Sequence, residues 1–339
     1  MPDSTAPTVT HEQIPANGIE LHVASAGPAD GPPVVLCHGF PELWYSWRHQ
    51  LGPLAEAGYR VLAPDMRGYG ASSTPKEVGA YGSDSLTGDL CGLLDHYGYD
   101  SAAFVGHDWG ALVLWEMGRL HPERVSSLYN LSVPFSPSPG PPTETFGAIF
   151  EGKFFYIVYF QPVGPAEAEL DADPRHFLRT ILYAAGGEAM ANGNALLVDF
   201  PREGTRFIDT LTPAPAQLPP WLTEEDVDVY AAAFEKSGFF GPVSYYRNMD
   251  ANWERSKDLG PSAYTMPVGF LTGSLDAVAS MLPGAVEAMA GSFPDFRGGT
   301  SVEGAATGCN RNGPRRPTPP CWHSSLRCGD VLASFLSAP

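Results

Sequence analysis

The chain has 339 residues, of which 43% are hydrophobic, so it can bury a substantial core and general disorder is excluded. Its formal net charge of −18 argues against nucleic acid or an anionic membrane surface as a partner. The N-terminal residues show no signal-peptide pattern, and no apolar run approaches the roughly 20 residues that span a bilayer. Five cysteines, an odd number, are expected to be reduced thiols in a cytoplasmic protein.

Strand-like and helix-like segments alternate from the start of the chain to about residue 133. Strands separated by helices are typical of βαβ units, so we predict a mostly parallel, doubly wound sheet. The predicted strands are Gly18–Ser25, Pro33–Cys37, Tyr59–Pro64, Ser101–Val105 and Val125–Leu131, and the predicted helices between them are Trp44–Ala57, Ser83–Tyr97 and Gly110–Leu120.

This alternation breaks at a proline-rich run, Pro134–Pro142, and the segment that follows is aromatic and poor in strand patterns. Strand patterns return at Pro267–Thr272 and Phe296–Val302. We therefore predict a core made of residues 1–133 and 241–339, with a helical lid at 134–240. A lid there would cover the C-terminal edge of the sheet, where open α/β sheets bind ligands. The alternative is a structural subdomain without a gating role, which the cluster of aromatic residues disfavours.

The sequence Gly106-His-Asp-Trp-Gly110 lies between a predicted strand and a predicted helix. This arrangement resembles the nucleophile elbow of α/β-hydrolases, with Asp108 in place of serine. A carboxylate needs no base to activate it, and on attack at an sp³ carbon it forms an alkyl ester. Asp108 is therefore predicted to displace a leaving group from an epoxide or an alkyl halide. A chance match in a loop is the alternative, which the flanking strand and helix disfavour.

The loop His38-Gly-Phe-Pro41 follows another predicted strand and is expected to face the elbow. In α/β-hydrolases, backbone N–H groups of this loop and of the residue after the nucleophile form the oxyanion hole. Here these donors would be Phe40 and Trp109. We expect His38 itself to be a structural hydrogen-bonding residue.

Asp276 follows the predicted strand Pro267–Thr272. Its position after the nucleophile in chain order fits the acid that orients a catalytic histidine in this fold. A simpler use of the same residue is to cap the N-terminus of a helix that begins at Ala277. The sequence leaves both uses open.

From residue 12 to about 304, the chain resembles the epoxide hydrolases of the α/β-hydrolase superfamily. The core motifs that carry the resemblance are His38-Gly-Phe-Pro-Glu42, Pro64-Asp-Met-Arg-Gly-Tyr-Gly70 and Gly106-His-Asp-Trp-Gly110. The resemblance implies a cofactor-independent and metal-free enzyme, monomeric or homodimeric, that converts a small apolar epoxide to a vicinal diol. The reaction would pass through an ester on Asp108.

Two segments of the predicted lid extend this resemblance. Residues 154–161 and 241–248 are similar to the two segments that carry the family's ring-opening tyrosines, which fall on Tyr156 and Tyr246. Two phenols above the nucleophile could hydrogen-bond the epoxide oxygen and donate a proton to it. Without the motif context, both tyrosines would be ordinary packing residues.

Two other functions remain open. Haloalkane dehalogenases share the Asp-Trp pair of the elbow, but they typically carry asparagine after His-Gly and lack the tyrosine pair. Fluoroacetate dehalogenases share His-Gly-Phe-Pro but generally have arginine after the nucleophile, where this chain has Trp109. A catalytically impaired hydrolase-like protein that binds ligands is the third possibility.

The third possibility arises because the chain departs from the family near its C-terminus. The catalytic histidine that the resemblance implies would fall at position 307, which is Thr307. Codons that encode residues 306–326 can be chosen so that another frame reads His-Trp-Val-Gln-Gln-Glu-Arg, and we hypothesise a local frameshift. In the printed frame the only later histidine is His323, which we expect to lie outside the site. Its spacing to Cys309, Cys321 and Cys328 matches no familiar zinc pattern.

Overall fold

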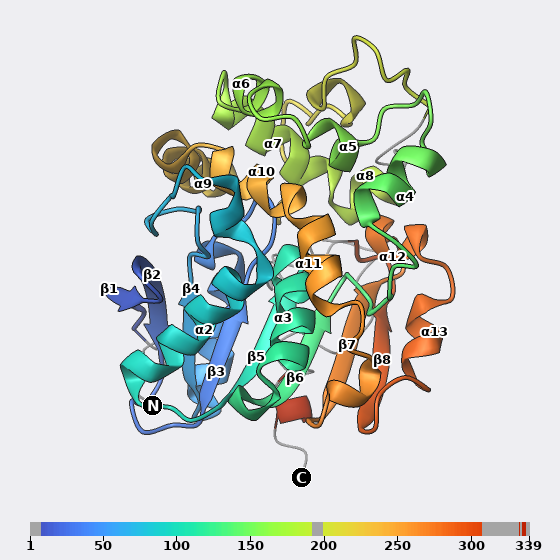
Figure 1. Ribbon diagram of the computed structural model, residues 1–339. Coiled ribbons are helices and arrows are strands. Elements are labelled where there is room, and N and C mark those ends of the chain that lie inside the picture. The colour runs from blue at the N-terminus through green and yellow to red at the C-terminus, as the bar shows by residue number, and fades with distance from the viewer. Residues whose placement is uncertain (1–7, 192–198, 307–331, 333, 337–339) are drawn as a thin grey trace.

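The computed structural model describes residues 8–191, 199–306, 332 and 334–336. Its eight-stranded sheet has the order β1-β2-β4-β3-β5-β6-β7-β8 and is mostly parallel, which confirms the predicted α/β-hydrolase fold (Figure 1). Only the pairs β1–β2 and β2–β4 are antiparallel. The strands are β1 (Thr10–Ala16), β2 (Ile19–Ala26), β3 (Pro33–Cys37), β4 (Arg60–Pro64), β5 (Ala102–His107), β6 (Val125–Leu131), β7 (Val268–Gly273) and β8 (Phe296–Val302).

Helices cover both faces of this sheet. Along β3, Val34 and Leu36 belong to the hydrophobic cluster that includes α1, whereas Val35 and Cys37 belong to the cluster that includes α2 and α3. Successive side chains of a strand point to opposite faces, so a strand covered on both sides must be apolar throughout. The helices of these layers are α1 (Arg48–Glu56), α2 (Ser83–Tyr97) and α3 (Trp109–Leu120), with α12 (Ala277–Met281) and α13 (Ala285–Met289) following β7.

The predicted elements agree with these bounds to within one or two residues at each end, with two corrections. The predicted helix Trp44–Ala57 is wrong in its first turn, which is a separate 3₁₀ helix, η1 (Trp44–Trp47), because Trp47 leaves the α-helical region at φ −94° and ψ 5°. Strand β1 was not predicted. Five of its seven residues are exposed, so its sequence lacks the apolar alternation that marks a half-buried strand.

Between β6 and β7 the chain forms a group of helices, most of which lie above the sheet in Figure 1, while the last of them lies beside the upper end of α3. These helices are α4 (Pro142–Ile149), α5 (Tyr156–Tyr159), α6 (Pro165–Leu170), α7 (Pro174–Ala184), α8 (Gly187–Ala191), α9 (Glu224–Ser237), α10 (Phe240–Arg247) and α11 (Met249–Ser256). Helix α9 is joined to η1 by the Tyr45 hydroxyl, which donates to Asp226 at 3.0 Å, and by the Ser46–Tyr230 hydroxyl pair at 2.7 Å. The division into a core and a lid at residues 134–240 stays a prediction.

No helix among the described residues is both long enough and apolar enough to cross a membrane. No group of three or more His, Cys, Asp or Glu side chains within the described ranges is arranged to hold a metal ion.

Candidate active site

Asp108 occupies a sharp turn between β5 and α3. Its backbone has φ +50° and ψ −117°, a left-handed conformation that few residues other than glycine adopt. The turn packs closely on the end of β3, where a Cβ on Gly110 would lie 2.1 Å from the carbonyl oxygen of Cys37. Glycine is therefore required at position 110 for the helix to approach the strand, and the strained turn presents Asp108 at the C-terminal edge of the sheet.

Both expected oxyanion donors meet the Asp108 carboxylate. The backbone N–H of Phe40 donates to Oδ1 at 2.7 Å, and the backbone N–H of Trp109 also donates to this carboxyl group. Burial raises the pKa of Asp108, while His107 and the two N–H donors act in the opposite direction. The carboxylate is thus held by fixed dipoles at a largely buried position.

Tyr156 and Tyr246 come together although they lie on α5 and α10. Their ring centroids are 5.7 Å apart in an edge-on arrangement, and the Tyr246 ring also lies edge-on to Trp109 at 5.0 Å. Burial is the main cause that raises the pKa of both phenols, and the Asp108 charge adds to it. Both hydroxyls therefore keep their protons at neutral pH.

Gln161 joins the two tyrosine helices. Its side-chain amide donates to the carbonyl of Ile157 at 2.7 Å and to the carbonyl of Tyr246 at 3.1 Å. The backbones that carry the two phenols are consequently tied through one side chain.

A buried hydrogen-bonded pair that the sequence did not predict, Glu42 and His107, lies next to Asp108. Glu42 Oε2 accepts from the backbone N–H of Gly39 at 3.0 Å and from Nδ1 of His107 at 2.8 Å, and both side chains are 1% exposed. Gly39 precedes the donor Phe40, and His107 precedes Asp108. Glu42 belongs to the motif His38–Glu42 and His107 to the motif Gly106–Gly110. A buried acid needs a hydrogen-bonding partner, so the sequence could have suggested that these two residues meet.

Asp276 lies just beyond the end of β7 and caps α12. Its Oδ1 accepts from the backbone N–H groups of Val278 at 2.9 Å and Ala279 at 3.2 Å, which confirms the helix-capping use. Burial raises its pKa, and a hydrogen bond from Ser132 opposes that effect. Ser132, which sequence reasoning missed, is fully buried at φ +69°. Thr307 and His323 lie outside the described residues, so the expected pairing of Asp276 with a histidine stays a prediction.

His38 has the structural role expected from the sequence. Its Nε2 accepts from the backbone N–H of Met66 at 2.9 Å, so Nδ1 carries the proton that it donates to the carbonyl of Gly39 at 3.0 Å. The ring thereby joins the oxyanion loop to the loop after β4. A histidine that is bonded at both nitrogens has no lone pair left to act as a base.

Comparisons with known proteins identify the family. The family described as alpha/beta hydrolase fold matches residues 32–155. Epoxide hydrolase A of Mycobacterium tuberculosis is 45% identical over 270 residues, which is 79% of this chain and 83% of that protein. Epoxide hydrolase 3 of Siraitia grosvenorii is 41% identical over 82% of this chain and 84% of that protein. The chain belongs to the epoxide hydrolase family.

Solved structures agree with this assignment. The crystal structure of epoxide hydrolase A from Mycobacterium thermoresistibile superposes with a TM-score of 0.85 at 41% identity, over 97% of this chain and 98% of that chain. An epoxide hydrolase from an endophytic Streptomyces gives a TM-score of 0.87 at 34% identity, over 97% of this chain and 95% of that chain. These relatives favour the epoxide hydrolase prediction over the haloalkane dehalogenase alternative.

Proposed function

We propose that this enzyme opens a small apolar epoxide by attack of the Asp108 carboxylate on a ring carbon. A bond forms between the carboxylate oxygen and that carbon, and the ring C–O bond breaks with its electron pair passing to oxygen. The oxygen takes a proton from Tyr156 or Tyr246, which leaves a hydroxyalkyl ester on Asp108. The observation that carries this proposal is the position of the Asp108 carboxylate, which accepts from the Phe40 N–H at 2.7 Å and whose charge adds to the effect of burial in raising the pKa of both phenols, the rings of which pack on each other.

The second half of the reaction requires water to attack the carboxyl carbon of the ester. Negative charge then develops on the carboxyl oxygen, and the N–H groups of Phe40 and Trp109 are placed to stabilise it. Collapse of the tetrahedral intermediate releases the vicinal diol and regenerates Asp108. The attacking water needs a base, and we propose that Asp276 orients the histidine that serves as that base in the family.

The printed chain has Thr307 where that histidine is expected, so we propose that its reaction stalls at the ester. The two histidines beside the nucleophile are already engaged, His38 through both ring nitrogens and His107 through its bond to Glu42. Loss of a positioned general base costs about 10²–10⁴ in rate. Ring opening uses Asp108 and the tyrosines alone and should proceed.

A labelling experiment tests this proposal. The protein is incubated with styrene oxide, and intact-mass spectrometry is followed by mapping of the modified peptide. We expect one added substrate mass on the peptide that contains Asp108, and none in Asp108→Asn. Turnover to the diol without any detectable ester would contradict the stall. Absence of both ester and diol would favour the ligand-binding alternative instead.

The location of the protein and its partners belong to the same proposal. We infer a cytoplasmic enzyme without a cofactor, a metal or a nucleic-acid partner, acting as a monomer or a homodimer. The net charge of −18 supports the exclusion of nucleic acid.

A further inference from the structure

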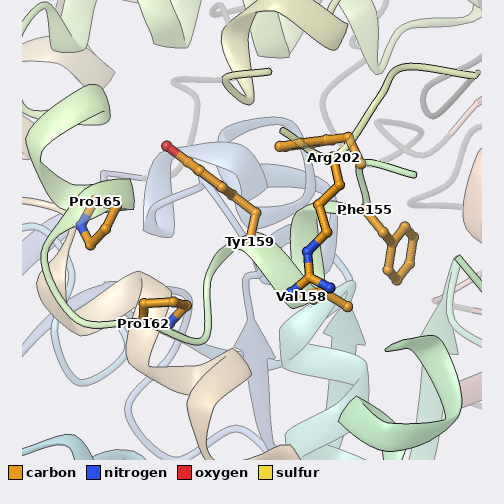
Figure 2. Close-up of a pocket in the computed structure, with 7 residues that line it drawn as sticks. Phe155, Val158, Tyr159, Pro162, Pro165 and Arg202 are labelled. Carbon is orange, nitrogen blue, oxygen red and sulfur yellow. The ribbon is translucent and has the colours of Figure 1, made fainter. Parts of the chain in front are cut away.

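A pocket lies in the helical segment above the sheet, against α5. Its volume is about 210 Å³, which suits a ligand the size of one aromatic ring with a short chain. Figure 2 draws the lining residues and labels six of them. The lining residues are mostly apolar: Phe154, Phe155, Val158, Tyr159, Pro162, Pro165 and Arg202.

Arg202 gives this apolar pocket a positive charge. Figure 2 shows its side chain reaching towards α5, with the guanidinium beside Val158. Neighbouring cations in this segment are neutralised, since Lys153 pairs with Asp199 and Arg206 pairs with Asp209. No ion pair or hydrogen bond joins the Arg202 guanidinium to another group in the described part of the chain.

The position of Arg202 is fixed by its backbone. Its N–H donates to the carbonyl of Gly152 at 3.1 Å, and the N–H of Phe154 donates to the carbonyl of Phe200 at 2.9 Å. These bonds hold the two walls of the pocket together. The other polar group, the Tyr159 hydroxyl, donates to Glu169 at 2.6 Å and points away from Arg202, so the guanidinium is left to meet a ligand.

We propose that this pocket is a second binding site, which takes a small amphipathic carboxylate. The apolar body of the ligand would pack on Phe155, Val158 and the prolines. Its carboxylate would accept a bidentate pair of hydrogen bonds from the Arg202 guanidinium. In a chain with a net charge of −18, a free guanidinium is a natural place for an anion to bind.

Occupation of this site would act on Tyr156, which belongs to the same one-turn helix as Val158 and Tyr159. A ligand that packs on Val158 and Tyr159 would restrain the short helix that also carries the Tyr156 phenol. This consequence rests on the proposed function, whereas the binding itself does not. The two are separated by measuring affinity without any epoxide.

The test uses 3-phenylpropionate as the probe and isothermal titration calorimetry on the full chain. Since Arg202 is exposed, Arg202→Gln should fold normally and bind the probe about fivefold more weakly. Arg206→Gln is the matched control, because it removes the same charge from the same segment and should bind as the parent chain does. The neutral amide, 3-phenylpropanamide, should bind the parent chain as weakly as the acid binds Arg202→Gln.

A second variant distinguishes this pocket from the active site. Val158→Phe should fill the pocket and abolish binding of the probe, with an unchanged melting temperature as the check on folding. Binding that survives both Val158→Phe and Arg202→Gln would place the probe elsewhere and overturn the proposal. No heat of binding to the parent chain at millimolar probe would overturn it as well.

Discussion

Glu42 offers a direct test of what holds the active site in shape. Its Oε2 accepts from two buried donors, the N–H of Gly39 and Nδ1 of His107, so truncation in Glu42→Ala removes the acceptor that both donors share. Each unsatisfied buried donor costs about 1–3 kcal/mol, and we expect the free energy of unfolding to fall by about 3 kcal/mol. Glu42→Gln keeps an amide oxygen for both donors but loses the charge, so its cost should be about 1 kcal/mol.

The same change should slow the chemistry. Gly39 precedes Phe40, and loosening the loop moves the Phe40 N–H away from the Asp108 carboxylate that it now meets at 2.7 Å. Loss of one oxyanion-hole donor costs about 10²–10³ in rate, so we expect Glu42→Ala to slow hydrolysis of the Asp108 ester by about 10².

Urea unfolding and the rate of ester decay measure these two effects. The matched control is Glu56→Gln on the exposed side of α1, which should change the free energy of unfolding by less than about 0.5 kcal/mol. An unfolding curve for Glu42→Ala that overlays the parent curve would refute the argument that the buried pair fixes this loop.

Four further predictions concern the active-site residues and the missing base. Tyr246→Phe should slow ester formation about 10–100-fold in single-turnover assays with styrene oxide, and an unchanged rate would remove Tyr246 from ring opening. Burial raises the pKa of Asp108, so this carboxylate should become protonated at a higher pH than an ordinary aspartate does. We therefore expect the rate of ester formation to begin to fall at that higher pH when the solution is acidified. For the same reason the ionised carboxylate destabilises the folded state. Asp108→Asn should therefore have a higher melting temperature than the parent chain at pH 7, and this difference should disappear at acidic pH, where Asp108 is protonated. A chain with the alternative C-terminal frame restored should turn over styrene oxide about 10²–10⁴ times faster, and equal steady-state rates would argue against the missing base.

Much of the fold could be predicted because its signals are local. An apolar strand, a glycine turn and a helix stand next to one another around Asp108, and the bounds of β3, β6, β8 and α2 agree with the predicted segments. Strand β1 was not predicted because its mostly exposed residues do not alternate between apolar and polar. Its strand conformation comes from backbone pairing with β2, which a local sequence pattern does not reveal.

The sequence by itself determined the class of the fold, and it predicted Asp108 as the nucleophile together with its expected partners, because each of these signals depends on residues close together in a motif. Tertiary structure decided which distant groups share a proton or a charge. Glu42 and His107 are 65 positions apart, and Tyr45 and Asp226 are 181 apart. The hydrophobic periodicity of a sequence does not predict such pairs. They form only when the sheet brings the ends of distant strands together and helices from elsewhere in the chain pack above those ends. The position of Arg202 against residues of α5 arises in the same way, from packing rather than from a sequence pattern.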